Sequence, residues 1–95
     1  MTLTEEQLTQ LEEMAAALMP PSDIALLLNI PHDKRALFVQ ICICHTSTEI
    51  FDAYQRGRLT TKLELRRTVV KLAKAGSPAA EPLAQKFIRE QSIDE

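Results

Sequence analysis

Five threonines in this sequence are followed, three residues later, by glutamine or glutamate, and three of these pairs stand where a helix could begin: Thr4 with Gln7, Thr46 with Glu49, and Thr61 with Glu64. This spacing is that of a capping box, in which two side chains satisfy free backbone N–H groups at the start of an α-helix. The chain also holds only two glycines and no tryptophan, which argues against an all-β protein with many tight turns. The sequence therefore predicts a fold built from helices.

The first predicted helix begins at Thr4 and ends at the Pro20-Pro21 pair, because a residue that precedes proline is disfavoured in the helical conformation. Its apolar residues recur at helical spacing and form one face: Leu8, Leu11, Ala15 and Leu18. A second, short helix covers residues 22–29, and Asn29 is able to adopt the left-handed conformation at its end.

The third segment, residues 33–45, is predicted to begin with Asp33 as its cap. Residues 36–44 are apolar except for Gln40 and include three β-branched side chains, so a buried strand is an alternative for them. We favour a helix because no partner strand is evident elsewhere in the chain.

Gly57 and Gly76 divide the second half of the chain. A fourth helix begins at Thr46 and reaches Gly57, which either breaks the helix there or lies inside one long helix over residues 47–75. A basic helix over about residues 61–76 ends at Gly76, because glycine is favoured just beyond helix C-termini. A last helix follows.

Residues 22–45 have features of a helix-turn-helix core. Ala25 supplies the small residue of the first helix, and Asn29 supplies the turn. The second helix, which would read the DNA, offers few polar groups to base edges: His32, Lys34, Arg35 and Gln40. The predicted fold is a compact, single all-α domain over residues 1–95, with five helices and this helix-turn-helix-like core.

The net charge of −2 hides a segregation of charge along the chain. Residues 1–33 carry six acidic residues and no lysine or arginine, whereas residues 54–76 carry seven basic residues and one acidic residue. A segregated basic segment favours a polyanionic partner. The alternative is that the acidic and basic segments attract each other, within one molecule or between subunits.

On a helical wheel, the basic helix separates into an apolar sector and a basic stripe. Arg67, Lys71 and Lys74 form the stripe at the spacing i, i+4, i+7, and such a stripe can follow a phosphate backbone. Arg66 falls inside the apolar sector, where an unpaired charge is costly. We expect Arg66 to pair with an acidic residue of another helix or subunit, with the first helix as the obvious source, or to reach solvent along its apolar stem.

Catalytic and metal chemistry are not indicated by the sequence. Cys42 and His45 share a helical face, but Cys44 points away from it, and a zinc site needs four converging ligands. No glycine-rich phosphate loop or nucleophile motif occurs. We therefore expect no enzyme activity, no cofactor and no metal.

Targeting signals are not evident either. The segment MTLTEEQLTQ has neither the basic nor the apolar region of a signal peptide, and no apolar run approaches the length of a membrane span. The two cysteines are too close in sequence to staple a fold, which fits a reducing compartment. We expect a cytoplasmic protein with no membrane partner.

Two short motifs in the second half of the chain are AYQRGRL, residues 53–59, and LAKAGSPAA, residues 72–80. Their combination resembles a pattern found in small terminase subunits and related phage DNA-packaging proteins, with Tyr54, Gly57 and Gly76 among the matching residues. The resemblance implies an all-α protein of phage or prophage type that binds viral DNA with a helix-turn-helix domain. It also implies assembly into a homo-oligomeric ring and transfer of the DNA to a separate large terminase motor subunit.

The leading hypothesis is thus a non-enzymatic DNA-binding or DNA-packaging adaptor. Five basic residues are predicted to contact the phosphates of double-stranded DNA, and two more are predicted as secondary contacts: Arg56, Arg58, Arg67, Lys71 and Lys74, then Lys34 and Arg35. The alternative is a helical protein–protein interaction or oligomerisation module with no nucleic-acid role. In that interpretation, Arg66 and Arg67 pair with Glu12 or Glu13 of a neighbouring subunit.

Overall fold

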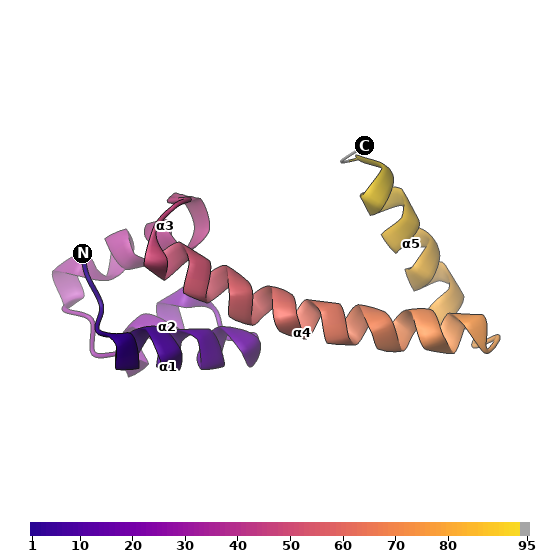
Figure 1. Ribbon diagram of the computed structural model, residues 1–95, viewed down its shortest axis with the longest axis horizontal. Helices are drawn as coiled ribbons and strands as arrows, with labels where there is room; N and C mark the ends of the chain where they lie inside the picture. The colour runs from indigo at the N-terminus through magenta and orange to yellow at the C-terminus, as the bar shows by residue number, and fades with distance from the viewer. Residues whose placement is uncertain (94–95) are drawn as a thin grey trace. The chain divides into compact units, whose positions relative to one another are not determined.

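The computed structural model describes residues 1–93, which contain five α-helices, one short 3-10 helix and no strand (Figure 1). In chain order the elements are α1 (Glu5–Ala16), α2 (Pro21–Leu27), η1 (His32–Lys34), α3 (Arg35–Cys44), α4 (Glu49–Lys74) and α5 (Ala80–Ile93). The all-α prediction is confirmed. The strand alternative for residues 36–44 is wrong, because these residues lie in α3.

The chain divides into two compact units, Met1–Thr61 and a second unit that begins at Lys62. The boundary falls inside α4, so the two units are joined by a continuous helix and not by a linker segment. The first unit therefore holds α1, α2, α3 and the first half of α4, and the second unit holds the rest of α4 and α5.

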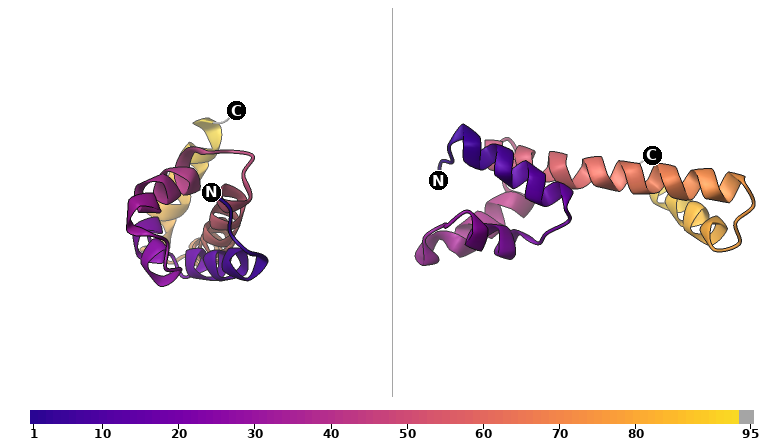
Figure 2. Two further views of the ribbon diagram at one scale, coloured as in Figure 1. Left: turned by 90° about the vertical axis from the view of Figure 1, so that its left-hand side faces the viewer. Right: turned by 90° about the horizontal axis from the view of Figure 1, so that it is seen from below.

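The first unit has a continuous apolar core, to which every one of its helices contributes. Figure 2 shows α1, α2 and α3 gathered beside the first half of α4. The largest side chains that are fully buried in it are Phe38, Leu11, Ile24 and Cys42. They come from α1, α2 and α3, and the first turns of α4 close the core with Ile50, Ala53 and Tyr54.

Gly57 lies where α4 passes closest to α1. A Cβ atom added at Gly57 would come within 2.1 Å of the Glu12 carbonyl oxygen and 3.0 Å of the Ala15 Cβ, so only glycine fits this approach. Four residues on, the Thr61 Oγ1 donates a hydrogen bond to the carbonyl oxygen of Ala16 at 2.5 Å. Gly57 is therefore a packing residue inside one long helix, and the alternative of a helix break is wrong.

Three of the predicted helix ends are confirmed. Thr4 forms the capping box of α1, since the Gln7 N–H donates to Thr4 Oγ1 at 3.1 Å and the Thr4 N–H donates to Gln7 Oε1 at 2.9 Å. Asn29 has a left-handed backbone with φ of 57°. At the end of α4, Gly76 has φ of 90°, and the N–H groups of Gly76 and Ser77 donate to the carbonyl oxygens of Ala73 and Leu72, as in a Schellman motif.

Other predicted ends are wrong. The cap of α4 is Thr48 instead of Thr46, because the Phe51 N–H donates to Thr48 Oγ1 at 3.1 Å. Thr61 caps nothing, since it lies inside α4. Asp33 does not cap α3 either, because it lies within η1, and α3 begins only at Arg35 without a side-chain cap.

The helix-turn-helix-like core over residues 22–45 is not confirmed. Residues 28–34, which include η1, separate α2 from α3. The turn of a helix-turn-helix motif is only about 3–4 residues long. The two helices pack on each other through the common core, but the connection between them is longer than that of the motif.

The second unit buries far fewer side chains than the first unit. Within residues 62–93, Ala80 is the one buried residue. Arg66 of α4 joins the two helices: its guanidinium lies 4.1 Å from the centroid of the Phe87 ring and donates a hydrogen bond to the Glu90 carboxylate. Arg66 thus has the structural role that its place in the apolar sector predicted, with a partner on α5.

Candidate nucleic-acid interface

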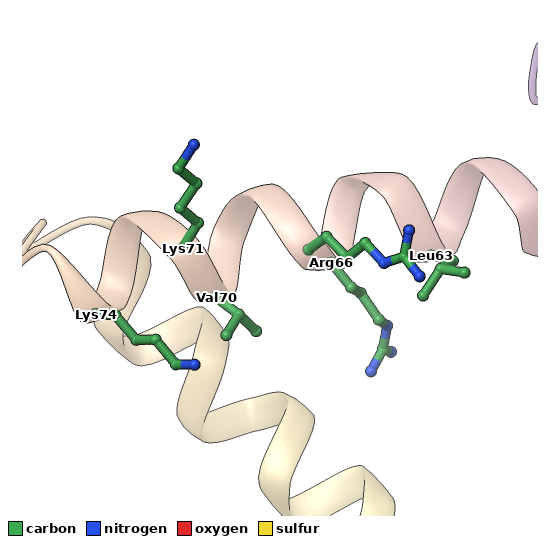
Figure 3. Close-up of a pocket in the computed structure, with 6 residues that line it drawn as sticks. Leu63, Arg66, Val70, Lys71 and Lys74 are labelled. Carbon is green, nitrogen blue, oxygen red and sulfur yellow. The ribbon is translucent and has the colours of Figure 1, made fainter.

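A groove runs along the second half of α4 and has a volume of about 460 Å³. Four basic and two apolar side chains line it: Arg66, Arg67, Lys71 and Lys74, with Leu63 and Val70 (Figure 3). All six come from one helix, because positions three, four and seven residues apart return to the same side. The predicted stripe of Arg67, Lys71 and Lys74 therefore lies within a single surface feature.

The three stripe cations are available to a ligand. Each is exposed, and none of them forms an ion pair with a residue of the described chain, 1–93. In Figure 3 the Lys71 and Lys74 side chains extend to different sides of the helix. Their charges therefore do not converge on one point, which suits an extended polyanion better than a single small anion.

Arg66 differs from the three stripe cations because its guanidinium already forms an ion pair within the chain. Its side chain is 29% exposed and pairs with Glu90. The hydrogen bond from Arg66 lowers the pKa of the Glu90 carboxyl below its ordinary value, and the nearby Lys86 and Lys62 act in the same direction. The predicted partner for Arg66, an acidic residue of the first helix, is wrong, since α5 supplies it.

The other predicted contact residues do not line the groove. Arg56 is exposed but pairs with Glu12 of α1 at 3.1 Å, and Arg58 is half-buried. The Arg35 Nε–H donates to the carbonyl oxygen of Ile30 at 3.0 Å. Lys34 is exposed at the end of η1. The structure thus groups three of the seven predicted residues.

Helix α3 would carry the base contacts in a helix-turn-helix protein. Its exposed side chains are mostly apolar: Ala36, Leu37, Gln40, Ile43 and Cys44. Gln40 is the single amide among them, and it alone has the chemistry to pair with a base edge. The surface of α3 therefore gives little basis for reading a DNA sequence.

The two cysteines have different environments. Cys42 is fully buried, and burial raises the pKa of its thiol from 9.0 to about 12. Cys44 is exposed on the other side of α3. Among residues 1–93, no group of three or more His, Cys, Asp or Glu side chains is placed to hold a metal ion.

Comparison with known proteins returns no relative: no family model, curated protein or solved structure matches the chain. The resemblance to small terminase subunits therefore stays a prediction. In the structure, Tyr54 and Gly57 are buried in the first unit and Gly76 ends α4, so these motif residues have packing and turn roles. Across the described helices, none has both the length and the apolar character needed to cross a membrane.

Proposed function

We propose that this chain is a non-enzymatic adaptor that binds double-stranded DNA through its phosphates, with Arg67, Lys71 and Lys74 as the contacts. The observation that carries the proposal is that these three cations share one groove and have no acidic partner within residues 1–93. At about 1.5 Å of rise per residue, Arg67 and Lys74 are separated by about 10 Å along α4. Because B-DNA carries one phosphate charge per about 1.7 Å of helix axis, both strands counted, a stripe of that length faces enough phosphates for each of the three cations.

The binding is expected to be independent of DNA sequence. Phosphate contacts position a protein on the duplex but carry no base information, and the exposed side chains of α3 are mostly apolar. The motif resemblance adds a context for such binding, namely DNA packaging of phage or prophage type with a large terminase motor as a further partner.

Salt dependence tests the proposal quantitatively. A protein that neutralises three phosphates has a slope of about −2.7 in log affinity against log salt, so affinity falls roughly 40-fold between about 50 and 200 mM salt. Fluorescence anisotropy with a labelled duplex measures this slope. No binding at about 50 mM salt would contradict the proposal.

A matched pair of triple variants separates the stripe from bulk charge. Arg67→Gln, Lys71→Gln and Lys74→Gln together should abolish the salt-dependent binding. The control, Lys62→Gln, Lys86→Gln and Arg89→Gln, removes the same charge from three exposed residues that do not line the groove, and should retain it. Equal loss in both variants would mean that net charge, and not the groove, attracts the DNA.

A helical protein–protein interaction module is the second candidate, and a separate observation favours it. Leu63, Leu65, Leu72, Leu83 and Ile88 of the second unit are all about half exposed, and covering the rest of each would contribute roughly 1 kcal/mol. The sequence predicted that Arg66 and Arg67 pair with Glu12 or Glu13 of a neighbouring subunit. The pairs that use Arg66 or Glu12 are not favoured, because these two side chains form ion pairs within the chain. Self-association without duplex binding would support this second candidate.

A further inference from the structure

Two apolar side chains of the groove, Leu63 and Val70, have no part in the phosphate contacts of the proposed function. Leu63 is 49% exposed and Val70 is 37% exposed, and both line the groove beside the stripe cations. Figure 3 shows them on the same side of α4. A ligand that is seated in the groove therefore lies against cationic and apolar side chains at once.

The lining residues form two rows that run side by side along α4. Leu63 and Val70 are seven residues apart, so they lie nearly in line, about 10 Å from each other along the helix axis. Arg67 and Lys74 have the same spacing and form a second row. At about 100° per residue, the two rows are about 40° apart around the helix, which is about 4 Å at the outer radius of a helix. Lys71 lies beyond the cationic row, farther from the apolar one.

The other edge of the apolar row offers no free charge. Arg66 lines the groove at that edge, and its guanidinium pairs with the carboxylate of Glu90 from α5. An anion gains little from this neutralised pair, whereas Arg67 and Lys74 have no acidic partner within residues 1–93. The groove is therefore asymmetric across its width: phosphates belong on the side of the stripe cations, and the apolar row faces whatever lies next to the phosphates.

In a nucleic-acid strand, the sugars lie next to the phosphates. We propose that Leu63 and Val70 pack against the sugars of the strand whose phosphates the stripe cations bind, and that the groove thereby selects deoxyribose over ribose. This inference rests on the proposed DNA function and leaves every stripe cation to the phosphates. It makes Leu63 and Val70 determinants of specificity for the kind of nucleic acid.

The selectivity follows from the chemistry of the 2′ position. Deoxyribose presents only C–H groups there, and an apolar side chain covers them without breaking a hydrogen bond. Ribose presents a hydroxyl that is both a donor and an acceptor, and neither Leu63 nor Val70 has a polar side-chain atom to pair with it. A hydroxyl that loses water without gaining a partner weakens the complex.

Three duplexes of one length and base sequence test the inference: DNA, RNA, and RNA with fluorine in place of each 2′-hydroxyl. The RNA and the 2′-fluoro duplex are both A-form, so a difference between them reports the hydroxyl and not the shape of the helix. In fluorescence anisotropy at about 50 mM salt, the DNA and the 2′-fluoro duplex should each bind about tenfold more tightly than the RNA. Equal affinities for the RNA and the 2′-fluoro duplex, or binding by neither, would overturn the proposal.

A matched pair of double variants assigns the selectivity to the apolar row. Leu63→Ser with Val70→Ser supplies hydroxyl partners, so the preference against RNA should fall to about twofold or less while the salt slope stays unchanged. The control is Leu65→Ser with Leu72→Ser, because these leucines are 54% and 48% exposed on the opposite side of α4. The control should keep the tenfold preference. An unchanged preference in the groove variant, or an equal fall in both variants, would overturn the proposal.

The same titrations separate this inference from the proposed DNA function. Failure of the DNA duplex to bind at about 50 mM salt would contradict the DNA function, and the inference would fail with it. DNA binding with the expected salt slope, but with equal affinities for the RNA and the 2′-fluoro duplex, would contradict the sugar contact alone.

Discussion

The two units of this chain differ in where their apolar side chains lie. In the first unit, Phe38, Leu11 and Ile24 are completely buried in a core shared by four helices. In the second unit, Leu63, Leu83 and Ile88 are about half exposed, and within residues 62–93 only Ala80 is buried. The first unit therefore contains the buried core of the chain, whereas the apolar side chains of the second unit stay largely exposed, and this exposure is why we propose the second unit as the binding surface.

The largest expected effect comes from removing the centre of the first core. Phe38 is fully buried, so Phe38→Ala should lower the free energy of unfolding by about 3–5 kcal/mol. Leu83→Ala, in a side chain that is 47% exposed, should cost less than about 1 kcal/mol. Denaturant unfolding followed by circular dichroism measures both. Similar losses in the two variants would break the contrast between the units.

The two glycines provide a second contrast. At Gly57, alanine would force α1 away from α4 because its Cβ would meet the Glu12 carbonyl oxygen, and we expect a loss of about 3 kcal/mol. At Gly76, an added Cβ atom meets no atom within 4 Å. Alanine there should destabilise the fold only through its left-handed backbone conformation, by about 1–2 kcal/mol. The same unfolding measurement applies. A neutral Gly57→Ala would show that α1 does not need this close approach.

Alkaline pH should weaken the first unit through Cys42. Its folded pKa of about 12 lies above its ordinary 9.0, so the neutral thiol stabilises the fold fully below pH 9. That contribution is lost between about pH 9 and 12, at about 1.4 kcal/mol per pH unit. Unfolding at pH 8 and pH 10 should show the loss in the wild type and a smaller one in Cys42→Ala. An unchanged pH dependence in the variant would contradict this assignment.

The smallest expected effect is confined to α5. Arg66 lowers the pKa of Glu90, so their pairing is fully present above the ordinary carboxyl pKa and is lost as pH falls through the lowered value. Glu90→Gln should speed hydrogen exchange of α5 amides at neutral pH while leaving the first unit unchanged. Combining it with Arg66→Gln, which also removes the Phe87 contact, should give less than the sum of the two single effects, because either change alone removes the pair. Additive effects would mean that the two side chains act independently.

Much of the helical framework could be predicted from local sequence, because its signals act over a few residues. The Thr4 capping box, the left-handed Asn29 and the end of α4 at Gly76 are all of this kind. The role of Gly57 could not be predicted from local sequence. Whether a glycine breaks a helix or allows a crossing depends on α1, more than forty residues earlier in the chain.

The residues of the candidate site likewise divide into those that local spacing predicted and those whose positions depend on contacts elsewhere in the fold. The spacing of Arg67, Lys71 and Lys74 on one helix was enough to place them together. The positions of Arg56 and Arg66 depended on Glu12 and Glu90, which the tertiary fold brings to them from 44 and 24 residues away. A count of basic residues along a sequence therefore overestimates the free basic surface, because it includes cations that form ion pairs or hydrogen bonds within the folded chain.

The most direct test of the account is to map the duplex on the protein by NMR amide chemical shifts at low salt. The shift changes should cluster along α4 around residues 63–74, at the groove, while the amides of α3 stay unchanged. Changes concentrated on α3, or no changes at all, would contradict the claim that the second unit is the binding surface.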